Sequence, residues 1–150
     1  MTQTHAYTTA KTYTIKAIAR DEHGVESDWT QYPWTIVIKT ASVELSLKMF
    51  NIYNVTAYVK NTGDIAISGL QWEFNISRDS LINFRDINVD GNGNIANLPI
   101  GGQETIFSSS TGLKIGWADV TVTASKTGVI TPAVITARAF LIGPIILILE

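Results

Sequence analysis

Residues 86–97 have the residue types and the spacing of a calcium-binding loop. They fit the pattern D-x-[DN]-x-[DN]-G, in which alternate positions offer oxygen ligands to Ca²⁺ and a glycine, here Gly91, allows the sharp turn. The twelfth position, where the pattern has a bidentate Glu, is Asn97. The sequence therefore predicts at most a weak calcium site. Its candidate ligands are Asp86, Asn88, Asp90 and Asn92.

The same segment also has an interpretation without a ligand. Its DGNGN run holds residues that tolerate positive φ, and apolar residues flank the run on both sides. These features are typical of a β-hairpin tip. The sequence leaves the calcium loop and the hairpin tip open as alternatives.

The segment DWTQYPW is the best candidate for a recognition surface. It contains Trp29, Tyr32 and Trp34, and aromatic rings stack on sugars or on the apolar surface of a protein partner. The alternative is that the three rings fill a junction between two modules. Pro33 and the alternating residues that follow it favour this structural role.

Two N-x-[ST] sequons make Asn54 and Asn75 candidate glycosylation sites. In both, the alternation of side chains places the Asn on the polar face of a strand, where a glycan would have room. The N-terminus lacks the charged start and long apolar run of a secretory signal. The sequons are therefore permissive evidence for a glycoprotein.

The inventory of reactive groups does not predict an enzyme or a cofactor. The chain has no Cys and two His, and nothing in the sequence brings His5 or His23 to a nucleophile and a carboxylate. Its net charge of −2 offers no basic footprint for nucleic acid. With 45% hydrophobic and 16% charged residues, the composition instead predicts a packed globular protein.

Side chains alternate between apolar and polar with a period of two in most of the chain, which predicts strands. The clearest runs are TYTIKAIAR, SVELSLKMF, NVTAYVK, LQWEFNIS and WADVTVTA, with turn signals such as DEHG, NTGD and SKTG between them. No window shows a sustained helical period. We therefore expect an all-β protein, an antiparallel Ig-like β-sandwich.

The C-terminal run AVITARAFLIGPIILILE raises the question of a membrane span. Arg138 and the Gly143-Pro144 pair leave too short an uninterrupted apolar stretch to cross a bilayer. We interpret the run as a buried strand and expect no membrane span.

The first 40 residues resemble the second half of a PKD-type Ig-like domain. In that family a His-x-Tyr pair leads into a strand with aromatic and aliphatic residues at alternate positions and then an Asp-x-x-Gly turn. His5 and Tyr7 match the pair, and Asp21 and Gly24 match the turn, whereas Lys11 stands where the family usually has Gly. The resemblance implies an incomplete N-terminal half-module over residues 1–40.

Residues 41–150 resemble a CARDB-like Ig-like domain of archaeal and bacterial surface proteins. The resemblance rests on VTAYVKNTGDIAISGLQWEF, a strand and turn followed by a strand with Trp72, and on the later PIGGQETI and AFLIGPIILIL. It implies a non-catalytic extracellular module at the cell surface, with a structural or adhesive role.

Two alternatives remain open for the function. The first is a subunit of an extracellular filament or oligomer that self-associates by β-strand exchange through the N-terminal strands, because an unpaired sheet edge is a template for strand addition. The second is a Ca²⁺-assisted carbohydrate-binding module, in which residues 86–97 and the aromatic segment would take part.

Overall fold

The computed structural model describes residues 4–7, 9–31, 33–77, 89–111 and 114–149. These residues form strands, turns and bends, with no helix among them, so the prediction of an all-β antiparallel sandwich is confirmed. In particular, this part of the chain has no helix that is long and apolar enough to cross a membrane. The chain divides into two compact units, residues 1–40 and 41–150.

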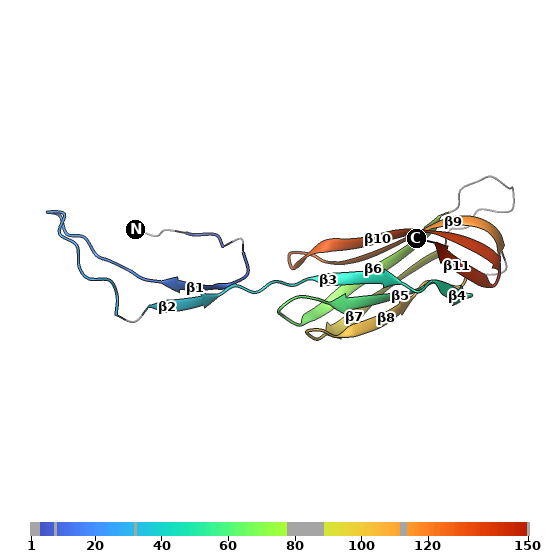
Figure 1. Cartoon of the computed structure of the whole chain (residues 1–150), viewed down its shortest axis with the longest axis horizontal. Helices are drawn as coiled ribbons and strands as arrows, with labels where there is room; N and C mark the ends of the chain where they lie inside the picture. The colour runs from blue at the N-terminus through green and yellow to red at the C-terminus, as the bar shows by residue number, and fades with distance from the viewer. Residues whose placement is uncertain (1–3, 8, 32, 78–88, 112–113, 150) are drawn as a thin grey trace. The chain divides into compact units, whose positions relative to one another are not determined.

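Unit 2, residues 41–150, is a sandwich of two antiparallel sheets (Figure 1). The larger sheet has the strand order β4-β11-β10-β9-β6-β7, and the smaller sheet has the order β3-β5-β8. The strands are β3 (Val43–Leu47), β4 (Phe50–Ile52), β5 (Thr56–Asn61), β6 (Ile67–Ser77), β7 (Val89–Leu98), β8 (Gln103–Phe107), β9 (Lys114–Lys126), β10 (Ile130–Gly143) and β11 (Ile145–Leu149).

The core of unit 2 lies between the two sheets. The predicted apolar faces of β5, β6 and β9 point into it, since Val59, Phe74 and Val122 are fully buried there. Side chains of β3 pack against the same cluster from the smaller sheet. Burial of this apolar area from water is the main force that holds the sheets together. The other apolar residues with 0% exposure are Val55, Ala57, Leu70, Leu98, Val120, Ala124 and Ala139.

The predicted NTGD turn is anchored by a buried amide. Asn61 is fully buried, and its Nδ2 donates hydrogen bonds to the carbonyl oxygens of Ile65 and Leu98, at 2.8 and 3.0 Å. Its Oδ1 accepts a hydrogen bond from the backbone N–H of Gly63 at 2.9 Å. A buried polar group is tolerated because its hydrogen bonds are satisfied. Asn61 therefore ties the end of β5 to the end of β7.

The DGNGN run does not form a hairpin tip. Residues 90–94 lie inside β7, which pairs with β6 from Ile76↔Val89 to Ile67↔Leu98. Gly93 is opposite Trp72, and a Cβ on Gly93 would lie 2.4 Å from the indole ring. The hairpin interpretation is therefore wrong. The two glycines are needed for close packing instead: Gly93 makes room for the Trp72 ring, and a Cβ on Gly91 would lie 2.9 Å from the Cα of Ser108.

Close packing of Trp72 on Gly93 predicts a coupled stability effect. Gly93→Ala should lower the free energy of unfolding by about 1–3 kcal/mol, because the new methyl group displaces the ring. Trp72→Ala removes the clash, so adding Gly93→Ala to it should cost less than the same change in the wild type. Urea unfolding of the four proteins measures this coupling. If Gly93→Ala lowered the free energy of unfolding equally in the wild type and in Trp72→Ala, the packing of Trp72 on Gly93 would be contradicted.

Unit 1, residues 1–40, contains a two-stranded sheet of β1 (Thr12–Ile15) and β2 (Trp34–Val37). The register Tyr13↔Ile36 and Ile15↔Trp34 places these four residues on one face of the pair. The opposite face carries Thr12, Thr14, Thr35 and Val37. The pair is therefore an amphipathic ribbon.

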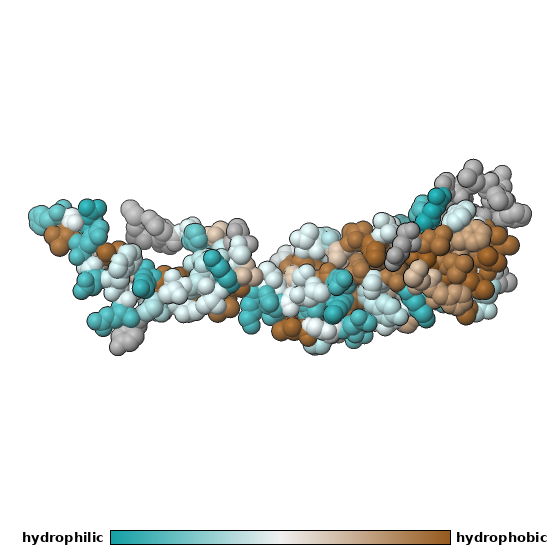
Figure 2. All heavy atoms as spheres, viewed as in Figure 1, coloured by the Kyte–Doolittle hydropathy of each residue, from teal (hydrophilic) through white to brown (hydrophobic). Residues whose placement is uncertain are grey.

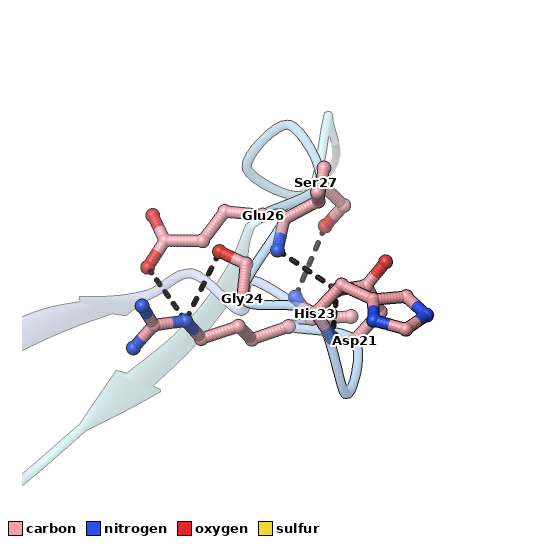
Figure 3. A network of polar contacts seen from close by, with 8 residues as sticks. Asp21, His23, Gly24, Glu26 and Ser27 are labelled. Carbon is pink, nitrogen blue, oxygen red and sulfur yellow. Dashed lines mark hydrogen bonds and ion pairs between the residues drawn. The ribbon is translucent and has the colours of Figure 1, made fainter.

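The predicted DEHG turn of unit 1 is held by local polar contacts (Figure 3). One carboxylate oxygen of Asp21 accepts hydrogen bonds from the backbone N–H groups of His23 and Val25, at 2.9 and 2.8 Å. The Arg20 Nε donates to the carbonyl oxygen of Gly24 at 3.2 Å and lies 4.0 Å from a carboxylate oxygen of Glu26. Asp21 thus has the role of an Asx turn, with Gly24 at a φ of 85°.

Unit 1 lacks a hydrophobic core in its described part. None of its described residues is buried, and Trp34 is 70% exposed. A two-stranded ribbon is marginally stable in water, because it gains too little apolar burial to offset the loss of chain entropy.

We therefore expect the two units to differ in local stability. Hydrogen exchange followed by mass spectrometry or NMR should show amides of β1 and β2 exchanging at least about 100-fold faster than those of β5, β6 and β9. The β5, β6 and β9 amides serve as the internal control. Comparable protection of both groups of amides would contradict the lower stability of unit 1.

Candidate docking face

An apolar surface on the outer side of the larger sheet is the main candidate for a functional site. We call it the apolar face and define it by the outward side chains of four neighbouring strands, β4, β11, β10 and β9. These side chains are Phe50, Ile52, Ile115, Trp117, Phe140, Ile142, Ile145, Leu147 and Leu149.

The strand register brings these residues into rows across the sheet. One row runs Trp117↔Phe140↔Leu147↔Phe50, and the next row runs Ile115↔Ile142↔Ile145↔Ile52. Cross-strand partners are about 5 Å apart and successive outward residues about 7 Å. The eight residues therefore form one continuous patch, which Leu149 extends along β11.

The apolar face is solvent-exposed. Seven of its side chains, all except Phe140 and Ile145, are between 36% and 68% exposed. Taking about 200 Å² for a large apolar side chain, the exposed area is on the order of 700 Å². The largest apolar patch on a monomeric protein is usually about 300–600 Å², and patches at that limit mark interaction sites.

Figure 2 shows apolar side chains gathered at the end of unit 2 that carries β4 and β11. The neighbouring outward rows on the same sheet are mainly polar, with Val134 as an exposed apolar exception. They include the pairs Asn75↔Thr121 and Glu73↔Thr123. The outer side of one sheet is thus divided into an apolar end and a polar end.

The border between the two ends carries a pair of opposite charges. Arg138 and Asp119 are cross-strand partners on β10 and β9, and both are exposed. The Arg138 guanidinium lies over the Trp117 ring at 5.2 Å from its centroid, while Trp117 and Phe140 have ring centroids 4.7 Å apart. A cation over an indole and a tilted ring pair both fix the position of Trp117.

A strained residue fixes β4 beside β11. Tyr53 directly follows β4 and has a φ of 66°, the one positive φ of a non-glycine residue in the described part of the chain. Its N–H donates to the carbonyl oxygen of Pro144 at 2.7 Å, and its own carbonyl accepts from the N–H and the Oγ1 of Thr111, at 2.7 and 2.9 Å. These three bonds compensate the backbone strain. The bond to Pro144 fixes the edge of the apolar face to the β10–β11 turn.

The C-terminal run does not form the buried strand that its composition suggests. It spans β10 and β11, which pair as a hairpin around Pro144. Its inward residues, such as Leu141 and Ile148, are buried, but its outward residues form most of the apolar face. The sequence signal is apolar character at both odd and even positions of FLIGPIILIL, where a half-exposed strand normally alternates.

The aromatic segment belongs to unit 1, whereas the apolar face belongs to unit 2. Trp29 and Trp34 belong to unit 1 and are 56% and 70% exposed, and Tyr32 lies outside the described residues. Trp34 shares the apolar side of the β1–β2 ribbon with Ile15. Their role in recognition stays a prediction.

The candidate calcium ligands are only partly described. Asp86 and Asn88 lie outside the described residues, while Asp90 and Asn92 are on the outward face of β7, opposite Asn75 and Glu73. In the described chain there is no group of three or more His, Cys, Asp or Glu residues placed to hold a metal. Calcium binding stays a prediction.

A shallow depression of about 460 Å³, lined mostly by residues of polar type, lies next to Asn92 on the same outer side of the sheet. Side-chain amides, hydroxyls and the Glu73 carboxylate surround it, with Trp72 behind Gly93. Such groups hydrogen-bond to sugars, and the carbohydrate-binding alternative stays a prediction.

The two sequons differ in their surroundings. Asn75 is exposed on the outer face of β6, as predicted. Asn54 is not on the polar face of a strand but in the bend after β4, and its Nδ2 donates to the carbonyl oxygen of Ser108 at 2.8 Å. Asn75 therefore offers the more accessible amide.

The histidines are exposed residues of unit 1. His23 Nε2 lies 3.6 Å from a carboxylate oxygen of Glu22, and both side chains are largely in solvent. His5 contacts the ring of Tyr7 edge-on, with centroids 4.6 Å apart. Both histidines therefore make local surface contacts.

Two comparisons of the chain with known proteins found no match. No protein-family model matches it, and a search of curated proteins finds no match. The resemblances to PKD-type and CARDB-like modules stay predictions.

The structure predicts that neighbouring residues on β10 contribute very differently to folding. Leu141 is 2% exposed and Ile142 is 47% exposed. Leu141→Ala should lower the free energy of unfolding by about 2–5 kcal/mol, because it leaves a cavity in the core. Ile142→Ala should cost less than about 1 kcal/mol in the monomer. Denaturant unfolding at low protein concentration measures both changes in the free energy of unfolding. Similar losses for the two variants would contradict the assignment of Leu141 to the core and Ile142 to the outer side.

Proposed function

We propose that the protein is a non-catalytic interaction module that docks onto an apolar protein surface through the apolar face. The observation that carries this proposal is the continuous exposed patch on β4, β9, β10 and β11. A surface of this size costs free energy in water, and covering it with a second apolar surface recovers that cost.

The composition of the apolar face also supports docking to protein. It combines two Phe and one Trp with aliphatic residues and contains no acidic side chain. Aromatic residues are enriched and charged residues depleted at the centres of protein interfaces. The adjacent Arg138 and Asp119 correspond to the polar rim that surrounds such centres.

The rigid support under the apolar face favours recognition of a fixed partner. Its four strands belong to one hydrogen-bonded sheet, and inward side chains of β9, β10 and β11 are part of the core. A preorganised surface loses little conformational entropy on binding. In our proposal, unit 2 is the scaffold and the apolar face is its contact point.

We propose that this contact is made at a cell surface, where the sequence resemblances imply a structural or adhesive role. Exposed Asn75 is compatible with glycosylation there. Assembly into an oligomer or filament is one form of the same function.

Site-specific photo-crosslinking tests the proposed function. The full chain should carry p-benzoylphenylalanine at Ile142, with Val134 as the matched control, because both are outward residues of β10 and Val134 is 58% exposed beyond the apolar face. We expect position 142 to give a discrete cross-linked protein species, in purified samples or in producing cells, and position 134 to give much less. No discrete species at position 142, or the same species at both positions, would overturn the proposal.

A further inference from the structure

We infer that the apolar face pairs with the apolar face of a second copy of this chain, related to the first by a two-fold axis. This inference rests on the proposed function and names the partner. Its evidence is the size of the patch, its self-complementary chemistry and the placement of the charges at its border.

The exposed area fits an interface between two copies. A stable protein interface buries about 800 Å² per partner, and the apolar face together with its border offers an area on this order. The apolar side of the β1–β2 ribbon is smaller, because it consists of four residues on two short strands. Unit 1 of another copy would therefore leave much of the apolar face uncovered.

The apolar face is chemically complementary to itself. A two-fold interface brings the same patch of both copies together, so each residue must tolerate its own neighbours. Here all nine residues are aromatic or aliphatic, and none brings an ionised group into the contact. Pairing therefore desolvates apolar side chains without burying a charge at the centre.

The border charges also satisfy a two-fold arrangement. Arg138 and Asp119 are cross-strand neighbours at one edge of the apolar face. A two-fold axis that lies in the contact plane, parallel to the strands and over the seam between β9 and β10, brings each Arg138 opposite the Asp119 of the second copy. These rim contacts have opposite charges and would select the symmetric orientation.

The first test is the solution mass of the full chain by sedimentation equilibrium across a wide concentration range. We expect a monomer–dimer equilibrium. Ile142→Glu should raise the dissociation constant at least about 100-fold, because symmetry places two carboxylates in the apolar contact. Val134→Glu is the matched control and should change the constant less than about threefold. Circular dichroism checks that both variants are folded.

The second test is a charge exchange that requires the two-fold arrangement. Asp119→Arg and Arg138→Asp should each weaken their own homodimer, because like charges then meet across the axis. Mixing the two variants in equal amounts should restore dimers, since Arg meets Asp in both rim contacts of the mixed pair. Mass spectrometry of isotopically labelled copies identifies the mixed dimers.

The outcomes separate this inference from the proposed function. Loss of dimer with Ile142→Glu alone, together with recovery on mixing, supports the symmetric pair. A chain that is monomeric at all concentrations, or equally sensitive to Val134→Glu, overturns it. If position 142 then cross-links to another protein, or to unit 1 of a second copy, the proposed function stands while the symmetric pair fails. If it cross-links to nothing, both fail.

Discussion

The pairing of β9 with β10 is the constraint on which the rest of unit 2 depends. The two strands run side by side from Lys126↔Ile130 to Lys114↔Gly143, and they pair onward with β6 and β11. Because side chains alternate across a strand, this register assigns every residue of the hairpin to the core or to the outer side. Val120, Val122 and Ala139 are held inside, and Trp117 and Ile142 are necessarily held outside.

The apolar face follows from that constraint. Near the β10–β11 turn the sequence is apolar at both parities, so burying one set of side chains exposes the other. A one-residue shift in register would exchange the two sets and would bring Arg138 into the core, at a large desolvation cost. The strands of unit 2 thus cannot bury the apolar face in their own core.

Sequence periodicity predicted three strands of unit 2 and their inward faces, whereas the run TYTIKAIAR forms a strand only over Thr12–Ile15 and has no buried face. The runs NVTAYVK, LQWEFNIS and WADVTVTA became β5, β6 and β9 with the expected residues buried. Other features depend on contacts between distant segments, which periodicity does not contain. The glycines of DGNGN pack against Trp72 and Ser108. Their role depends on how β7 lies against β6 and β8, which the sequence of residues 90–94 alone does not contain.

The candidate site was the harder part to predict. Residue types that bind metals or stack on ligands predicted sites at residues 86–97 and in the aromatic segment. The apolar face contains neither a titratable nor a metal-binding side chain. Its signal was the loss of alternation in FLIGPIILIL, which is equally typical of a strand buried on both sides. The two cases are distinguished by the sheet order, because the described residues of unit 2 place no further layer over the outer side of β10 and β11.

Hydroxyl-radical footprinting of the unmodified chain, at low and high protein concentration, tests the central claim most directly. Oxidation rates of individual aromatic side chains report whether each ring is covered. The account predicts that Phe50 and Trp117 become protected as concentration rises, while Trp34, on the other unit, keeps its reactivity. Unchanged reactivity of Phe50 and Trp117 at all concentrations, or protection confined to unit 1, would contradict it.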